Sequence, residues 1–344
     1  MHSNFQFTTS NLRHQTRLAC GLIPLLNLLR DRGVDTGDIL SCAGIWKFEL
    51  FDPAFTISFE QELKIVEKAL EYIPEPHASL ELASRYHLHN FSVLGLAFRS
   101  CATLGEIFDL VLQYPRLLWG ACETSNSVKG SLISFELKAG ENRAERFLLE
   151  RDMACIKTLF GEALNNELQL TDVKFSHPEP EDISVYEAFF NCPVLFDQPV
   201  SEMRFPIAET ERTVPTADPL SKEFYEAQCA RISADIDKPF RYAYLIRDHL
   251  SRMTPMPGLD GLAKRLEIEL RTLQRLLSKE GETFSKILQE VRFKRAVDRL
   301  QYSNLTTEQI AQELGFNDAV AFSHAFKLWA GVAPRQWRAD HALL

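Results

Sequence analysis

The chain has 344 residues, of which 45% are hydrophobic and 25% charged, and its formal net charge is -9. This length suits two domains better than one, and the composition is that of a globular protein with ample material for a core. The charge is unevenly distributed, because residues 255–344 carry a net charge of +2 and the remainder carries -11. Attraction to phosphate depends on where Lys and Arg lie, so the acidic total does not exclude a nucleic-acid partner for the C-terminal part.

Seven cysteines are scattered along the chain and never form a C-x-x-C pair. This arrangement excludes a disulfide framework and zinc-ligand spacing, and it indicates free thiols in a reducing cytosol, with a redox-sensing role for one of them as the alternative. The apolar run from Leu18 to Leu29 contains Pro24 and Asn27, is followed by Arg30, and has no cleavage site, so it is interpreted as a buried helix rather than a signal peptide. No apolar run has membrane-spanning length. We expect a cytoplasmic protein without a membrane partner.

The N-terminal part mixes helices and strands. Apolar residues recur at helical spacing from residue 18 to about 120, and between residues 127 and 138 the pattern changes to the alternation of a strand. A long helix is expected at about 143–165 and a short one at 185–190. Further strands are expected at 170–176, 193–196 and 203–207. This part is therefore predicted to be α+β.

A polar, proline-punctuated stretch from Thr210 to Pro219 marks a boundary, and two helices lead from it to the segment Pro255–Gly258. Beyond that point the sequence predicts helices only. The expected organisation is an α+β sensing and dimerisation domain at 1–215, a helical linker at 216–254, and an all-α DNA-binding domain at 255–344.

The segment from Thr306 to Arg338 has the layout of a helix-turn-helix. Thr306 or Thr307 can cap its first helix, Gly315 permits the left-handed turn, and Asp318 can cap the second helix. The side chains left exposed on that second helix are those that could reach DNA: Ala319, Val320, Ser323, His324 and Lys327.

A second, similar pattern lies upstream, from Leu259 to Gly281. Leucines form its inner face, and its outer face carries Arg271, Thr272, Gln274, Arg275 and Ser278. Arginine suits bidentate contact with guanine and glutamine suits adenine. Because polar side chains of these types share one face of a repeated motif, we expect them to read bases rather than to be merely solvated.

One helix, from Ser285 to Tyr302, separates the two motifs and is apolar on more than one side. Such a helix can act as a strut that holds the two recognition helices about one DNA turn, ~34 Å, apart. Its cations, among them Arg292, are candidates for either phosphate contacts or salt bridges between the lobes. The predicted phosphate contacts are Arg292, Lys327 and Arg338.

The double motif, with its Gly-Phe turn, spaced phenylalanines and final Gly-x-x-Pro, closely resembles the DNA-binding domain of the AraC/XylS family of bacterial transcription regulators. The resemblance implies base contacts by Arg271, Gln274 and Arg275, and by the four residues Ala319, Val320, Ser323 and His324. Two departures matter. Glu269 stands where the family usually has a Ser or Thr cap on the first recognition helix. Val320 and His324 stand where side chains with more hydrogen-bonding capacity are common. The first recognition helix is therefore expected to supply most of the base specificity.

Residues 18–207 resemble, more diffusely, the arabinose-binding/dimerisation domain of the family branch that includes ornithine-utilisation regulators, for example in Leu50–Pro53 and in the run from Phe190 to Phe196. The resemblance implies a small-molecule effector, a homodimer, an activator function and RNA polymerase as a partner. It does not locate the effector pocket. The aromatic residues are assigned to the core rather than to a pocket wall: Phe135, Tyr186, Phe189, Phe196 and Phe205.

Two alternatives remain. The N-terminal domain could serve only for dimerisation, or it could be an enzyme fused to a DNA-binding tail. The sequence offers no nucleophile–base pair, glycine-rich phosphate loop or metal-ligand set, so no catalytic residue, metal or cofactor is expected and the chain is predicted not to be an enzyme.

Overall fold

The computed structural model describes residues 16–52, 54–118, 120–236 and 242–341. Residues 1–15 of the expected sensing domain, 237–241 of the expected linker and 342–344 of the expected DNA-binding domain lie outside this part. The chain forms two compact units, residues 1–238 and 239–344. Within the described residues, no helix combines the length and the apolar character needed to cross a bilayer.

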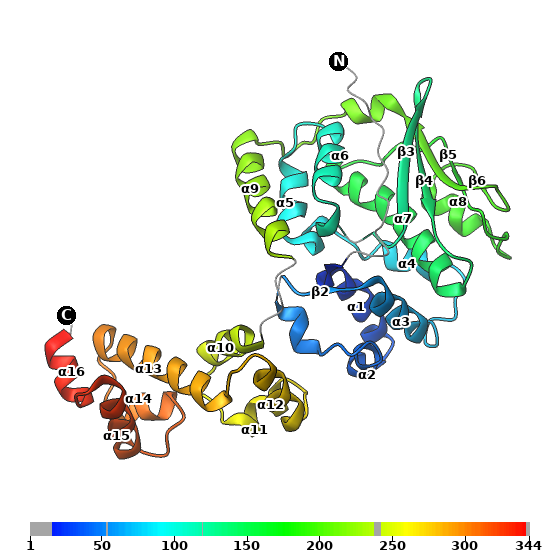
Figure 1. The fold of residues 1–344 in the computed structure, drawn as a ribbon. Helices are drawn as coiled ribbons and strands as arrows, with labels where there is room; N and C mark the ends of the chain where they lie inside the picture. Colours follow the sequence, from blue (N-terminus) through cyan, green and yellow to red (C-terminus); the bar gives the residue numbers. More distant parts are fainter. Residues whose placement is uncertain (1–15, 53, 119, 237–241, 342–344) are drawn as a thin grey trace. The chain divides into compact units, whose positions relative to one another are not determined.

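Helices make up most of unit 1 (Figure 1). The α-helices are α1 (Ile23–Asp31), α2 (Thr36–Ser41), α3 (Phe59–Ala69), α4 (Ala78–Ala83), α5 (Ser92–Ser100), α6 (Leu104–Gln113), α7 (Arg143–Leu164), α8 (Ser184–Phe190) and α9 (Pro219–Asp235). Short 3-10 helices lie at Ala19–Leu22, Lys47–Phe51, Leu88–Phe91, Pro115–Leu117 and Ile207–Glu211. The long helix predicted at 143–165 is confirmed as α7, which begins at an Asn142 cap and ends at Asn165 in the left-handed region.

Unit 1 also contains a five-stranded sheet with the strand order β3-β4-β7-β5-β6. Its strands are β3 (Glu123–Lys129), β4 (Leu132–Lys138), β5 (Asp172–Lys174), β6 (Val194–Leu195) and β7 (Ser201–Pro206). Only the pair β5–β6 is parallel. A second small sheet pairs β1 (Arg17–Leu18) with β2 (Thr56–Ile57). The predicted α+β class is therefore confirmed.

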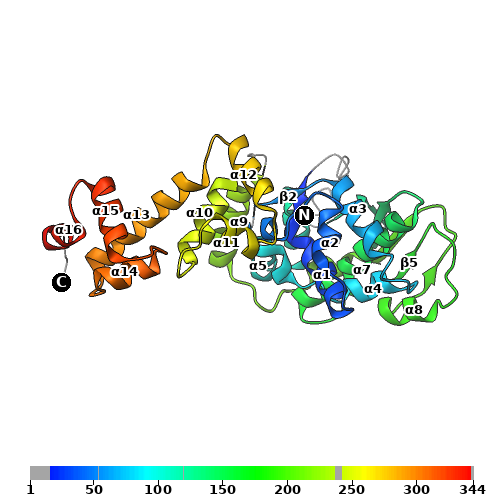
Figure 2. The same cartoon turned by 90° about the horizontal axis from the view of Figure 1, so that it is seen from below.

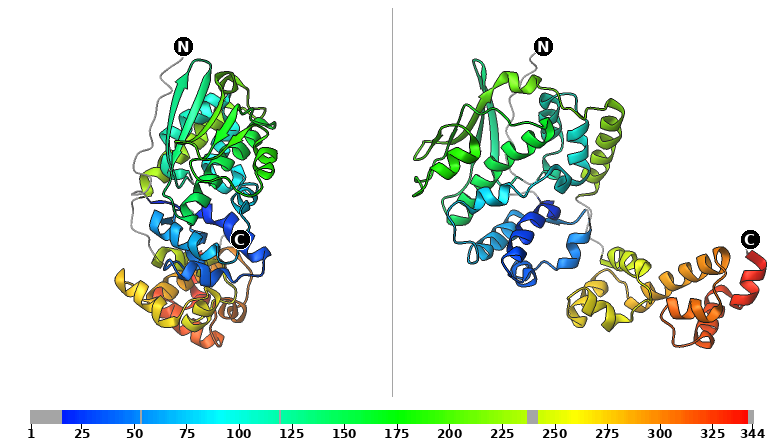
Figure 3. Two further views of the ribbon diagram at one scale, coloured as in Figure 1. Left: turned by 90° about the vertical axis from the view of Figure 1, so that its right-hand side faces the viewer. Right: turned by 180° about the vertical axis from the view of Figure 1, so that it is seen from behind.

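Helix α7 runs between the sheet and the helical layer of α5 and α6, and α9 lies on the far side of α5 (Figures 1 and 3). The alternating residues of β4 bury Ile133, Phe135 and Leu137, as the sequence predicts. Phe135 lies 5.4 Å, between ring centroids, from both Phe108 of α6 and Phe205 of β7. These rings join the sheet to the helices, so this layer contains part of the core of unit 1.

Unit 2 is all-α within its described residues, as predicted. Its helices are α10 (Tyr242–Arg252), α11 (Leu259–Arg265), α12 (Leu270–Lys279), α13 (Phe284–Tyr302), α14 (Thr307–Glu313), α15 (Ala319–Ala330) and α16 (Pro334–His341). Helix α13 is the predicted strut. It has α10, α11 and α12 near its beginning and α14, α15 and α16 near its end (Figure 2).

The two helices expected to form a separate linker at 216–254 belong instead to different units. In unit 1, α9 packs on α5, Lys222 Nζ lies 3.2 Å from Glu106 Oε2, and the Tyr114 hydroxyl donates to the Glu226 carbonyl at 3.3 Å. In unit 2, α10 packs on α13, and Arg247 forms ion pairs with Glu282 and Glu290 at 3.1 and 2.9 Å. The boundary therefore lies between residues 238 and 239.

Candidate nucleic-acid interface

The second helix-turn-helix is built by the caps and the turn that the sequence predicts. The Thr306 hydroxyl accepts from the Gln309 amide, and the Gln309 side chain accepts from the Thr306 amide, which closes a capping box on α14. Gly315 has φ +73° and makes the turn, and the Asp318 carboxylate accepts from the Ala321 amide at 2.7 Å to begin α15. Local hydrogen bonding therefore fixes where the recognition helix starts.

Helix α15 buries one face and exposes another. Phe322 and Phe326 have no exposed surface, whereas 78% of Val320 is exposed. Of the predicted DNA-facing residues, His324 and Lys327 are also exposed, and Ala319 and Ser323 are half-buried.

The sequence interpretation omitted Leu328 of α15, which is also 78% exposed. Its spacing could have revealed it, because Val320, His324 and Leu328 follow one another at intervals of four along a helix.

The first helix-turn-helix places α12 on a leucine-rich inner face. Leu273, Leu276 and Leu277 are buried, and Leu262 of α11 has no exposed surface. Glu269 precedes α12 and makes no side-chain cap hydrogen bond, in keeping with its departure from the usual Ser or Thr.

The outer face of α12 presents polar side chains. Arg271, Gln274 and Arg275 are exposed, and Thr272 is half-buried. Within the part of the chain that the structure describes, neither arginine is paired with a carboxylate. Their spacing of three and four residues puts these three side chains on one face, where they form a row of hydrogen-bond donors and acceptors.

Arg292 of the strut has an internal role. Its Nε and Nη2 atoms donate to the carbonyls of Leu314 and Gly315, both at 2.8 Å, and its guanidinium lies 4.3 Å from the centre of the Phe316 ring. Burial lowers the pKa of this guanidinium. Arg292 therefore holds the turn of the second motif to α13 through carbonyls, and its phosphate contact stays a prediction.

Arg338 is likewise used inside the unit. It donates to the carbonyls of Leu305 and Leu300 at 2.6 and 3.3 Å, which attaches α16 to the end of the strut. Two of its donor atoms are thus directed at backbone oxygens, and the phosphate contact of Arg338 stays a prediction. Among the described residues, Lys327 is the one of the three predicted phosphate contacts whose side chain is exposed, since Arg292 and Arg338 are half-buried.

Unit 1 contains an apolar cavity of about 130 Å³. Its wall comes from α5, α6, α7, β3, β4 and the segment after α6, and it includes Phe98, Phe108, Phe135, Leu137, Leu159 and Phe160. Phe135 was assigned to the core, and it both packs in the core and lines this cavity. The other four aromatic residues assigned to the core lie outside the wall.

Comparison with known proteins extends these observations. A model of the arabinose-binding N-terminal domain of AraC transcription regulators matches residues 33–214, and a helix-turn-helix domain model matches residues 262–340. The ornithine utilization regulator of Pseudomonas aeruginosa is 29% identical over 319 residues, which cover 91% of this chain and 94% of that protein. The uncharacterized HTH-type transcriptional regulator Rv1395 of Mycobacterium tuberculosis is 28% identical over 339 residues, which cover 94% of this chain and 95% of that protein.

A crystal structure of the transcriptional regulator CdpR from Pseudomonas aeruginosa aligns with 94% of this chain and 99% of its own, at 22% identity and a TM-score of 0.46. The family and the relatives named above are transcription regulators rather than enzymes. The domain models together match both units, and the first alone covers residues 33–214. This chain therefore belongs to the AraC family of DNA-binding transcription regulators, with an N-terminal domain of the arabinose-binding type.

Proposed function

We propose that the protein is a sequence-specific activator that reads DNA with two recognition helices and responds to a small-molecule effector bound by unit 1. The observation that carries the DNA-reading part is the row of exposed polar side chains on α12: Arg271, Gln274 and Arg275. Bidentate contacts of Arg with guanine and of Gln with adenine are each worth about 1–3 kcal/mol of discrimination. The proposed base contacts comprise these three and Thr272 on α12, and Ala319, Val320, Ser323 and His324 on α15.

The proposed phosphate contact is Lys327, because its ammonium is exposed beside the outer face of α15. A phosphate contact adds affinity without sequence information and increases the dependence of binding on salt.

The effector part of the proposal is supported by the apolar cavity of unit 1 and by the arabinose-binding description of the family model. A preformed cavity favours this function over an N-terminal domain that serves only for dimerisation. RNA polymerase is the proposed partner in activation, and the proposed place of action is the cytoplasm, where bacterial DNA lies.

We also propose a homodimer. Leu220 and Phe224 are 77% and 60% exposed, and they lie one turn apart on α9. Exposed apolar side chains that lie next to one another often mark a protein–protein interaction site. Phe224→Glu should then lower the molar mass measured by light scattering from that of a dimer to that of a monomer, and an unchanged mass would remove this surface from the proposal.

Selection of binding sites by the full chain from a random duplex library tests the DNA-reading function. Arg271→Ala and Gln274→Ala should each lose about 5- to 150-fold of the preference for the selected site over a scrambled one, while retaining salt-sensitive non-specific binding. Arg252→Ala, which removes an arginine that is 75% exposed on α10, is the matched control and should keep the preference. A wild-type protein without any preferred sequence would refute the proposal.

The same binding assay distinguishes the phosphate contact proposed for Lys327 from the structural role of Arg292. Lys327→Met should reduce the slope of log affinity against log salt concentration by about 0.9, the value for one lost phosphate contact. Arg292→Met should leave that slope unchanged and lower the stability instead, because two carbonyls lose their donor. A reduced slope in Arg292→Met together with an unchanged slope in Lys327→Met would contradict both assignments.

A further inference from the structure

The cavity of unit 1 has a wall that is poor in polar groups. Among the described residues that line it, Asp152 is the only one whose side chain is charged at neutral pH. The remaining wall is formed mainly by aliphatic and phenylalanine side chains from α5, α6, α7 and the sheet. Burial raises the pKa of the Cys155 thiol in this wall far above its usual value, so the thiol is neutral. The ligand chemistry therefore depends on what the Asp152 carboxylate can offer.

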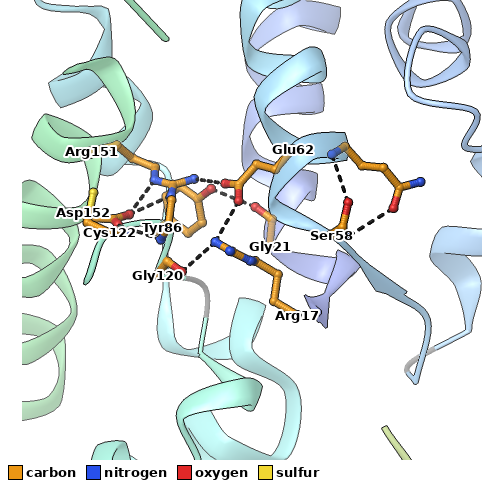
Figure 4. A network of polar contacts seen from close by, with 11 residues as sticks. Arg17, Gly21, Ser58, Glu62, Tyr86, Gly120, Cys122, Arg151 and Asp152 are labelled. Atoms are coloured by element: carbon orange, nitrogen blue, oxygen red, sulfur yellow. Dashed lines mark hydrogen bonds and ion pairs between the residues drawn. The ribbon is translucent and has the colours of Figure 1, made fainter. Parts of the chain in front are cut away.

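The Asp152 carboxylate is fully engaged by the protein (Figure 4). Its Oδ1 accepts from Nε and Nη2 of Arg151 at 2.9 and 2.6 Å. Its Oδ2 accepts from the backbone amides of Ala121 and Cys122 at 2.7 and 2.9 Å. Four donors fill the acceptor sites of a carboxylate. Asp152 therefore has no acceptor left for an ammonium group of a ligand.

The neighbouring charges balance one another as well. Arg151 Nη1 donates to Glu62 Oε1 at 2.9 Å, and Arg17 Nη1 donates to Glu62 Oε2 at 3.0 Å and to the Gly120 carbonyl at 2.7 Å (Figure 4). Two guanidinium groups thus face the carboxylates of Glu62 and Asp152, and all four side chains are buried. The charges of these four side chains balance, and of the four it is Asp152 that lines the cavity.

A charged ligand in such a cavity would lose its hydration without gaining a partner, which strongly disfavours binding. An amino acid such as ornithine carries two ammonium groups and a carboxylate, and a sugar carries several hydroxyl groups that each need a hydrogen bond. The cavity volume of about 130 Å³ is instead close to the roughly 150 Å³ of an apolar protein cavity that binds benzene. The rings of Phe108 and Phe160 pack edge to face at 4.9 Å and offer both an edge and a face to an aromatic guest.

We infer that the effector cavity of unit 1 binds a small, neutral, apolar molecule of about the size of one aromatic ring, rather than an amino acid or a sugar. This inference rests on the proposed function of unit 1 as an effector sensor. The inferred ligand differs from the arabinose that the description of the domain family names.

Ligand binding to the full chain tests the inference, with toluene and indole as neutral apolar probes and with hexanoate, L-ornithine and L-arabinose as charged or polar ones. Val111→Phe and Ile156→Phe each add a ring to the cavity wall. Val200→Phe is the matched control, because Val200 is 39% exposed and does not line the cavity. The measured quantities are the shift of Tm with each probe and the Kd from calorimetric titration.

Toluene or indole should raise the Tm of the wild-type chain and of Val200→Phe. In Val111→Phe and Ile156→Phe this rise should disappear, or the Kd should increase by at least about tenfold. The charged and polar probes should produce no shift. A cooperative thermal unfolding transition like that of the wild-type chain shows that each filled variant is folded.

Apolar probes that fail to bind the wild-type chain, or that bind the filled variants equally well, would overturn the inference. Binding of hexanoate, L-ornithine or L-arabinose that is lost in both filled variants would overturn the ligand class while leaving effector sensing intact. Failure of the proposed function is distinguishable, because it would appear as a chain that selects no DNA sequence or as a promoter response that no compound alters.

Discussion

Gly315 has two separate reasons to be glycine. Its φ of +73° lies in the left-handed region, which costs other residues about 1–2 kcal/mol. In addition, a Cβ at this position would lie 2.1 Å from the carbonyl oxygen of Met256, which is backbone and cannot move aside cheaply. The sequence predicts the first reason from the turn, whereas the second depends on a contact between the two lobes of unit 2.

We therefore expect Gly315→Ala to lower the free energy of unfolding of unit 2 by about 3 kcal/mol or more. Gly331→Ala is the matched control. Gly331 has φ +79° and nothing within 4 Å of the added Cβ, so only the backbone term of about 1–2 kcal/mol should appear. Urea unfolding followed by circular dichroism measures both variants. Equal losses in the two variants would contradict the proposed clash with Met256.

The arginines of α13 show why single-residue roles were hard to assign from the sequence. Arg292, Arg295 and Arg299 look alike in a helical pattern, yet Arg292 and Arg295 donate to carbonyls and Arg299 pairs with Glu313 at 2.8 Å. A sequence contains the cations but not the positions of backbone oxygens from distant segments. The internal bonds of Arg292 were therefore not predictable, whereas the turn at Gly315 and the cap at Asp318 were, because they depend on adjacent residues.

At the scale of elements, α10 is part of the DNA-binding unit rather than of a linker. It buries Leu245, Ile246 and Leu250. Its Arg247 forms ion pairs with Glu282, between α12 and α13, and with Glu290 of α13. The hydrophobic pattern of α10 alone could not reveal this, because an apolar helix face does not say which partner it packs against.

A fragment of residues 255–344 should consequently be much less stable than a fragment of residues 239–344. Removal of α10 uncovers the surface of α13 and forfeits three buried aliphatic side chains, each worth about 1.5–3 kcal/mol. Urea unfolding of the two fragments measures the difference. As a control, Tyr244→Ala in the longer fragment should change the free energy of unfolding little, because Tyr244 is 67% exposed. Equal stability of the two fragments would show that α10 is only a linker.

Strand β3 and the cavity mark the limits of prediction for unit 1. The residues of β3, Glu123–Lys129, are mostly polar because β3 is an edge strand, so they lack the apolar alternation that reveals β4.

The cavity is lined by Phe98, Phe135 and Phe160, which come from three separate elements. Each of them looks like an ordinary core residue in the sequence, and only the fold brings them around one space.

At the scale of the whole molecule, the revised boundary sharpens the separation of charge. Residues 239–344 carry a net charge of +4 and residues 1–238 carry -13. The DNA-binding unit is therefore more basic than the range 255–344 suggested, and it is tethered to a strongly acidic unit. An acidic unit repels DNA phosphates over a distance set by the salt concentration.

The full chain should accordingly bind random-sequence duplex DNA more weakly than the fragment 239–344 at about 50 mM salt, and the difference should shrink at about 300 mM salt. Fluorescence anisotropy with a short labelled duplex measures both affinities. A ratio of affinities that does not change with salt would show that the acidic unit exerts no electrostatic effect on DNA binding.

The single helix α13 between the two motifs also has a consequence for the DNA itself. Each residue of a helix adds 1.5 Å and turns the chain by about 100°, so the length of α13 fixes both the distance and the angular phase between α12 and α15. One extra base pair between the two halves of a binding site would turn the second half by about 35° around the duplex axis. Binding sites in a genome should thus vary in their bases but keep one constant gap, and a site search with this gap held fixed should recover the genes under control.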